Sequence, residues 1–242
     1  MGEVSERLGQ ITSAVAHIDE RSHDVSEAMG VLTTSNDSSR KALDNTQARI
    51  DRLVGMGERL IAATASSGIA TVDTPFIEAA KEAAAKIVAA LEAELDGGRL
   101  SIADLFDEQY VPIAGTNPQQ VRTRFLDATD RLFPSIQEPM LAVDPRVVFC
   151  AAVDRNGYLP THNRKFSQPQ GSDVAWNTAN SRNRRIFNDR VGLSAGRSTQ
   201  PFLVQTYRRD MGNGQFALMK DVSAPISIRG RHWGGVRVAY KI

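Results

Sequence analysis

The chain of 242 residues has little of what disulfide-bonded, membrane and metal proteins need. Its single cysteine, Cys150, excludes an internal disulfide and a thiolate-rich metal site, and it agrees with a reducing cytoplasm. The longest apolar runs, such as VVFCAAV at 147–153, fall far short of the ~20 residues that cross a bilayer. Charged residues scattered through positions 1–20 do not fit a secretory signal peptide. We therefore expect a cytoplasmic protein without a membrane segment.

The sequence also has no large surplus of positive or negative residues. Lys and Arg number 29 and Asp and Glu number 28, so no overall field favours nucleic acid or an anionic membrane as a partner. Catalytic motifs are also absent: there is no nucleophile elbow, no His-Glu-x-x-His, no Walker loop and no dinucleotide fingerprint. We therefore expect a protein that is not an enzyme, with no catalytic residue and no metal site.

Proline is absent before Pro75, and because proline interrupts helices this asymmetry divides the chain near residue 70. In the first part, alternate steps of four and three residues from Val4 meet an apolar residue at twelve of seventeen positions. These seam residues are Val4, Leu8, Ile11, Val15, Ile18, Val25, Met29, Leu32, Leu43, Ile50, Leu53 and Leu60. A heptad pattern of this length predicts a coiled-coil helix over residues 1–70 and a homodimer through residues 4–60.

Residues 71–242 predict a second domain that begins with a helical lead-in over 71–145. Asp73 or Thr74 is a suitable N-cap for its first helix, Pro75 fits the first turn, and Gly97 closes the end. A further helix is expected to start near residue 118 and to be broken by Pro134 and Pro139.

After Pro145 the apolar period changes from 3.6 to 2, which indicates strands over 146–242. The segments RVVFCAAVD and YLPTHN flank an Asn-Gly turn, a helical stretch follows, and three more strands end the chain. Short glycine-containing turns at 211–214 and 229–231 favour antiparallel neighbours. The sequence therefore predicts an α+β fold: a long coiled-coil helix, then a five-stranded antiparallel sheet with a helical flap over one face.

This order of elements resembles the Cache and PAS superfamily of sensor domains. AVDRNGYLPTHN at 152–163 resembles the first hairpin of a Cache-type module, and NRRIFND at 183–189 resembles the helical segment after it. The segment from Phe216 to Ile242 resembles the last strands, which commonly border a sensory ligand. The helical first quarter resembles the signalling part of bacterial methyl-accepting chemotaxis proteins. The resemblance implies a cytoplasmic chemoreceptor with its sensory domain after the signalling rod.

The sequence departs from the chemoreceptor pattern in one respect. The Glu-rich, Gly-containing hairpin tip that contacts the chemotaxis kinase and the coupling protein is absent, and no paired Glu/Gln methylation segment is recognisable. These partners are therefore expected only if a longer chain supplies the tip. The sequence is either the C-terminal fragment of a longer receptor or a truncated relative that dimerises.

For His162, at the end of the predicted first hairpin, the sequence allows three interpretations. It is a ligand-binding group, an axial ligand of non-covalent haem, or a hairpin histidine bonded to a backbone carbonyl. Covalent haem is excluded because there is no Cys-x-x-Cys-His motif. The sequence leaves the cofactor unknown.

A pocket under the flap is the second candidate site. Arg185 in the flap, or Arg209 in a strand, suits a carboxylate or phosphate, and a solvated face is the equal alternative for the flap arginines. Alternation places Tyr207 on the face of Arg209, and Asp221 then becomes the acidic counterpart for an ammonium group. Such a pair suits a zwitterion. The aromatic residues expected to line this pocket, or else to be plain core, are Trp176, Phe187 and Trp233.

Two functions follow from this reading. The first is a sensor that binds a small molecule in its C-terminal domain and shifts a dimeric coiled coil. The second is a structural dimerisation module whose sheet has a filled interior without a ligand.

Overall fold

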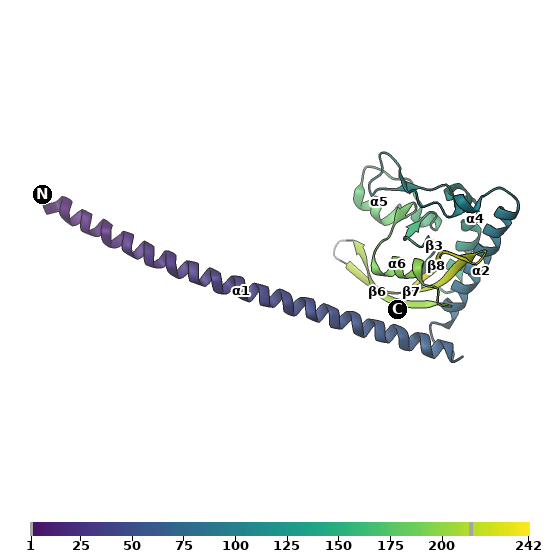
Figure 1. Cartoon of the computed structure of the whole chain (residues 1–242), viewed down its shortest axis with the longest axis horizontal. Coiled ribbons are helices and arrows are strands. Elements are labelled where there is room, and N and C mark those ends of the chain that lie inside the picture. The colour runs from purple at the N-terminus through teal and green to yellow at the C-terminus, as the bar shows by residue number, and fades with distance from the viewer. Residues whose placement is uncertain (1, 213–214) are drawn as a thin grey trace. The chain divides into compact units, whose positions relative to one another are not determined.

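The computed structural model describes residues 2–212 and 215–242 and confirms the α+β class (Figure 1). A long N-terminal helix precedes a four-stranded antiparallel sheet, two smaller two-stranded sheets and several shorter helices. The chain forms two compact units, Met1–Met56 and Gly57–Ile242. Within the described residues, no helix is long and apolar enough to cross a membrane.

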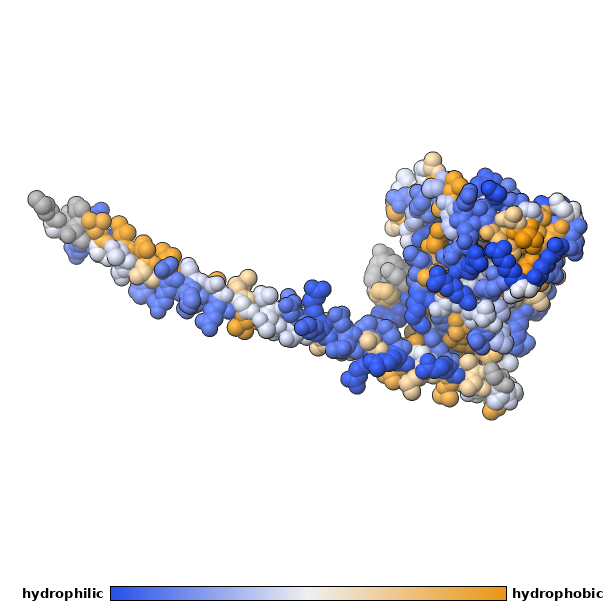
Figure 2. All heavy atoms as spheres, viewed as in Figure 1, coloured by the Kyte–Doolittle hydropathy of each residue, from blue (hydrophilic) through white to orange (hydrophobic). Residues whose placement is uncertain are grey.

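Helix α1 (Gly2–Ser66) runs without a break through the segment that lacks proline. The apolar seam residues from Leu8 to Leu60 are all exposed, from 48% for Ile50 to 69% for Leu43. Figure 2 shows such apolar residues at the surface of α1 beside hydrophilic ones. Among the described residues, therefore, none buries the seam residues from Leu8 to Leu60.

Helix α2 (Thr74–Asp96) begins and ends where its capping residues predict, with Asp73 at the N-cap and Gly97 at the C-cap. The Asp73 carboxylate does not cap the helix. It accepts hydrogen bonds from Lys220 Nζ at 2.7 Å and from the Tyr240 hydroxyl at 2.7 Å. These bonds fix the start of α2 to the sheet.

The segment after α2 departs from the sequence prediction. It contains α3 (Ile102–Leu105), β1 (Val111–Pro112), β2 (Val121–Arg122), α4 (Leu126–Gln137) and the 3-10 helix η1 (Pro139–Ala142). The helix expected from residue 118 starts only at Leu126, because Val121 pairs with Pro112 in a short ladder. Pro134 does not end α4.

The sheet has the strand order β3 (Val147–Asp154), β8 (Arg231–Lys241), β7 (Gln215–Ile228) and β6 (Leu203–Gly212), all antiparallel. The turn between β7 and β8 has positive φ at Arg229 (49°) and Gly230 (77°), as a tight two-residue hairpin requires. The predicted turn at 211–214 includes positions 213–214, which lie outside the described residues.

The prediction of a fifth strand in this sheet is wrong. Strand β4 (Tyr158–Leu159) pairs with β5 (Arg185–Ile186) in a separate two-stranded sheet. The Asp154 carboxylate accepts the backbone N–H groups of Asn156 and Tyr158, and this turns the chain away from β3. Pro160 then offers no N–H for a ladder.

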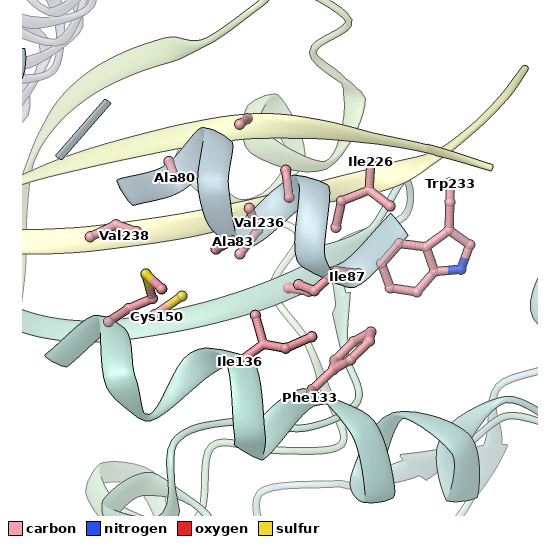
Figure 3. Close-up of a cluster of buried hydrophobic side chains, with 14 of the residues drawn as sticks. Ala80, Ala83, Ile87, Phe133, Ile136, Cys150, Ile226, Trp233, Val236 and Val238 are labelled. Atoms are coloured by element: carbon pink, nitrogen blue, oxygen red, sulfur yellow. The ribbon is translucent and has the colours of Figure 1, made fainter. Parts of the chain in front are cut away.

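The main core lies between one face of the sheet and helices α2 and α4 (Figure 3). Its labelled members are Ala80, Ala83, Ile87, Phe133, Ile136, Cys150, Ile226, Trp233, Val236 and Val238. The alanines of α2 allow the helix to approach the strands closely. Cys150 is fully buried, and this burial raises the pKa of its thiol, so an inert thiol is expected.

Residues 158–200 cover the opposite face of the sheet, and we call this segment the flap. It contains η2 (Arg164–Phe166), α5 (Val174–Asn180) and α6 (Arg190–Arg197). Helix α6 lies so close to β8 that a Cβ atom at Gly235 would be 2.3 Å from the carbonyl oxygen of Ala195. Glycine is therefore required where the flap meets the sheet.

The last turns of α1, which belong to the second unit, contact both the core and the outer edge of the sheet. Ile61 and Ala65 pack against the main core. Glu58 Oε1 accepts a hydrogen bond from the backbone N–H of Thr206 at 3.2 Å and from Arg190 Nη1 at 3.3 Å. Arg190 Nη2 also donates to the Thr206 carbonyl at 3.1 Å. This group of contacts occupies the free edge of β6.

Candidate functional site

The flap-covered face of the sheet carries polar residues on adjacent strands. Strand register places four residues side by side across it: Gln205, Asp221, Ala239 and Phe149. Tyr207 and Arg209 share this face because side chains two positions apart on a strand point the same way. The predicted alternation on β6 is therefore confirmed, and Arg208 is exposed on the other face.

Asp221 lies in the middle of this face and pairs with Arg237 of β8. Arg237 donates to Asp221 Oδ2 from Nη2 at 2.7 Å and from Nε at 3.0 Å, and both residues are buried. Burial raises the pKa of the Asp221 carboxyl above its ordinary value, and the charge and hydrogen bonds of Arg237 act against this rise. The acidic group that the sequence assigns to a ligand amine thus has a cationic partner within the protein.

Arg209 lies between aromatic rings. Its guanidinium carbon is 5.8 Å from the ring centroid of Phe149 and 5.2 Å from that of Phe166. The buried Nη1 atom has no hydrogen-bond partner. Burial lowers the pKa of Arg209, and burial raises that of the neighbouring Tyr207 to about 12. At neutral pH Arg209 is charged and Tyr207 is protonated.

The flap contributes two more guanidinium groups to the same region. Arg182 and Arg185 lie 4.9 Å and 5.2 Å from the ring centroid of Phe187. Each donates one long hydrogen bond, of 3.4 Å, to the carbonyl of Thr178. Burial, together with the nearby charge of Arg209, lowers the pKa of Arg182 to about 10. We call Arg182, Arg185, Arg209 and Arg237 the arginine layer.

Two buried polar atoms beside the arginine layer lack hydrogen-bond partners. Gln205 and Ser223 are each 2% exposed, and neither Gln205 Oε1 nor Ser223 Oγ forms a hydrogen bond. Strand register places Gln205 opposite Asp221 and Ser223 opposite Arg237. Gln205, Ser223 and Arg237 are not among the site residues that the sequence pattern predicts. The alternation that placed Tyr207 also places Gln205 on this face.

His162 reaches the same layer from the flap, but as a packed neutral ring. It is 2% exposed and lies 5.2 Å from the Phe149 ring and 4.9 Å from the Phe166 ring. Its Nδ1 accepts the backbone N–H of Asn163 at 2.7 Å. Burial, with the charges of Arg182 and other cations, holds the pKa of His162 well below its ordinary value. These surroundings do not fit haem, because a porphyrin plane beside this imidazole would displace Phe149 or Phe166.

The polar residues next to His162 hold the flap in place. Asn163 is fully buried, and its Oδ1 accepts the backbone N–H of Cys150 at 2.8 Å. Thr161 donates to Asp130 Oδ1 at 2.6 Å, and the Arg164 N–H donates to Glu138 Oε1 at 2.7 Å. These contacts join the flap to β3, to α4 and to the C-cap residue of α4, so the polar residues at 161–164 have a structural role.

The three candidate aromatic residues are not brought together. Phe187 contacts the arginine layer, whereas Trp176 lies on α5 with 44% of its surface exposed. Trp233 belongs to the core on the other face, where its Nε1 donates to the Leu105 carbonyl. For Trp233 the alternative of plain core is therefore the one the structure shows, and the rings that lie against Arg209 are those of Phe149 and Phe166.

Two open depressions of the second unit lie away from the arginine layer. The first, of about 660 Å³, is lined by Asp130, Arg131, Pro134, Ser135, Glu138, Pro139 and Arg164. The second, of about 500 Å³, is bordered by residues of α2 and β7. In the first, Asp130 and Glu138 already accept hydrogen bonds from the flap. Among the residues described, no group of three His, Cys, Asp or Glu side chains is placed to hold a metal ion.

No family model and no curated protein matches the chain. Among solved structures, the chain is similar to an extracellular ligand binding receptor from Desulfohalobium retbaense DSM5692, with 13% sequence identity and a TM-score of 0.29. The match covers 72% of this chain and 26% of that receptor, so the chain spans about a quarter of its length.

Proposed function

We propose that the chain is a cytoplasmic, chemoreceptor-like signal-transduction sensor and not an enzyme. Its C-terminal domain binds a small molecule between the flap and the sheet, and binding alters a dimeric coiled coil formed by α1. The observation that carries this proposal is that three polar atoms under the flap are buried without hydrogen-bond partners. We call these atoms, Gln205 Oε1, Ser223 Oγ and Arg209 Nη1, the polar layer.

The energetics of that layer favour a ligand site over an ordinary core. A buried polar atom without a partner costs roughly 1–3 kcal/mol, and native proteins contain few of them. Of eight such atoms among the described residues, three lie on one face of two adjacent strands, β6 and β7. On its other face the same sheet is covered by apolar side chains. A ligand with polar groups satisfies such atoms.

The route from this layer to α1 runs through strand β6. Gln205 and Tyr207 face the layer, and Thr206 between them contacts Glu58 of α1 through its backbone N–H. Arg190, the first residue of α6, contacts both Glu58 and Thr206. A ligand that shifts β6 or α6 therefore changes the surroundings of α1. Coupling of 1–3 kcal/mol is the usual scale for such links.

We propose that the seam residues of α1 are buried by the α1 helix of a second copy of the chain. Heptad seams are buried by other helices, and this seam is exposed in the single chain. In a parallel, in-register dimer, the residue before a seam position of one helix (heptad position g) faces the residue five positions further along its partner (position e). None of these pairs brings like charges together. The flanking pairs are Arg7–Thr12, Ala14–Asp19, Arg21–Ser26, Ala28–Thr33, Ser35–Arg40, Ala42–Gln47 and Arg49–Val54.

Native mass spectrometry of freshly purified full-length protein tests the proposal, together with an absorption spectrum. We expect a mass above that of the bare chain, and the excess is lost on denaturation. The alternative is a ligandless structural dimerisation module, in which water satisfies the polar layer and the aromatic rings fill the rest. That module shows the bare mass and no thermal shift with any small molecule, and this result would remove the sensor proposal.

A further inference from the structure

The arginine layer holds more positive charge than the protein neutralises. Four guanidinium groups lie there, and Asp221 is the carboxylate that pairs with one of them, Arg237. Among the residues that the structure describes, neither Arg182, Arg185 nor Arg209 forms an ion pair with a carboxylate. Like charges held close together in a half-buried region repel one another. The layer is therefore short of negative charge.

Aromatic contacts hold three of these cations without using up their hydrogen-bond donors. The Arg209 guanidinium lies against Phe149 and Phe166, and those of Arg182 and Arg185 lie against Phe187. A cation over a ring is attracted to the ring face, and its N–H groups still point outward in the plane of the guanidinium. The planar fork of arginine matches carboxylate and phosphate oxygens.

Of the described carboxylates near this layer, Asp221 pairs with Arg237, and Asp189 is exposed and accepts the backbone N–H of Gly192 at the start of α6. Asp221 already accepts two short bonds from Arg237 and is 0% exposed, so an ammonium group would have to displace a buried guanidinium. The zwitterion suggested by the sequence pattern is therefore not supported at Asp221. A ligand of negative charge meets Arg209 and the flap arginines first, because these are only half-buried.

We propose that the layer binds a small oxyanion, a carboxylate or a phosphate without an ammonium group, held chiefly by Arg209 of the sheet and Arg182 of the flap. Gln205 and Ser223 lie farther along the same face of the sheet, opposite Asp221 and Arg237. This inference rests on the proposed sensor function and names the chemistry of its ligand. Because Arg209 belongs to β6 and Arg182 to the flap, an anion between them draws the two together.

Calorimetry on the full chain tests the inference, after dialysis against a buffer whose anion is chloride. The probes are acetate and succinate for carboxylates, inorganic phosphate for phosphates, and choline as a cation. We expect binding of at least one oxyanion and none of choline. The Arg209→Gln variant should bind the oxyanion at least tenfold more weakly, equivalent to about 1.4 kcal/mol. The carboxylate and phosphate arms show which source the site prefers.

The neighbouring Arg208 supplies a matched control, because it carries the same charge on the same strand but is exposed on the opposite face. Arg208→Gln should change oxyanion affinity less than twofold, and Arg209→Lys should lie between Arg209→Gln and the wild type. Equal losses in Arg208→Gln and Arg209→Gln would show a general charge effect and overturn the site.

A measurement without ligand gives a second check. Because Arg209 is repelled by its neighbours, Arg209→Gln should raise the melting temperature of the ligand-free chain in low salt, and Arg208→Gln should not. An unchanged or lowered melting temperature in Arg209→Gln would contradict the charge shortage. If the purified protein retains a cationic or neutral molecule and binds no oxyanion, the proposal of an oxyanion ligand is wrong and the proposed sensor function still stands. No retained molecule and no binding of any probe would remove both.

Discussion

Glu58 near the end of α1 and Arg190 at the start of α6 form an ion pair, with Nη1 3.3 Å from Oε1, across the free edge of β6. The Glu58 side chain is 13% exposed and that of Arg190 is 49% exposed. The same carboxylate oxygen accepts the N–H of Thr206. Glu58 of the long helix therefore contacts both the edge strand β6 and helix α6 of the flap.

A double-mutant cycle with Glu58→Gln and Arg190→Gln measures this link. Half-exposed ion pairs are screened by solvent, so we expect a coupling energy of about 0.5–1 kcal/mol in urea unfolding. Arg59→Gln serves as the control, because Arg59 is exposed next to Glu58 in sequence and should be additive with Arg190→Gln. A cycle that closes to zero would contradict a direct link between α1 and α6.

The seam of α1 predicts a dimer at micromolar concentration in sedimentation velocity. Leu32 lies on the seam, and burying a Leu in the dimer stabilises it by roughly 1.5–3 kcal/mol for each copy. Because Leu32→Asn removes this burial, it should weaken the dimer about a hundredfold or more. Val31 is equally exposed in the single chain but lies off the seam, so Val31→Asn should leave the dimer unchanged. A monomeric wild type would count against the coiled coil.

The buried pair of Asp221 and Arg237 should behave as part of the fold. Asp221→Asn or Arg237→Gln strands a buried charge, and we expect each to lower the free energy of unfolding by about 3–5 kcal/mol. Arg229→Gln breaks an exposed pair with Asp96 and should cost under about 1 kcal/mol. If Asp221→Asn instead keeps full stability and loses ligand affinity, Asp221 belongs to the binding site.

The neutral state of His162 predicts a decline in stability at acid pH. Its folded-state pKa is lowered by burial and by Arg182, Arg209, Arg237 and Lys165, whereas the unfolded chain takes up a proton near pH 6.5. The unfolded state binds more protons, so this contribution is complete above pH 6.5 and is lost below it, by about 1.4 kcal/mol per pH unit.

Urea unfolding between pH 7.5 and 5.5 checks this decline. The His162→Phe variant should lose this part of the pH dependence, because phenylalanine keeps an apolar ring between Phe149 and Phe166 and cannot take up a proton. His23→Asn should retain it, because His23 is exposed on α1. Parallel pH profiles for wild type and His162→Phe would show that His162 does not titrate on unfolding.

Local patterns determined much of the fold from sequence. The absence of proline and the heptad spacing predicted α1, and capping residues predicted both ends of α2. Alternation correctly placed Tyr207 on the same face of the sheet as Arg209. Such features depend on residues a few positions apart, so a single sequence contains them.

The tertiary structure decided which groups meet. Asp221 pairs with Arg237 because β7 and β8 are neighbours, and no local pattern says so. The separate pairing of β4, the contact of Asn163 with Cys150 and the isolation of Gln205 Oε1 also depend on segments far apart in sequence. Alternation gives the face of each side chain. Strand order, register and the path of the flap give its partners, because these minimise the free energy of the whole domain at once.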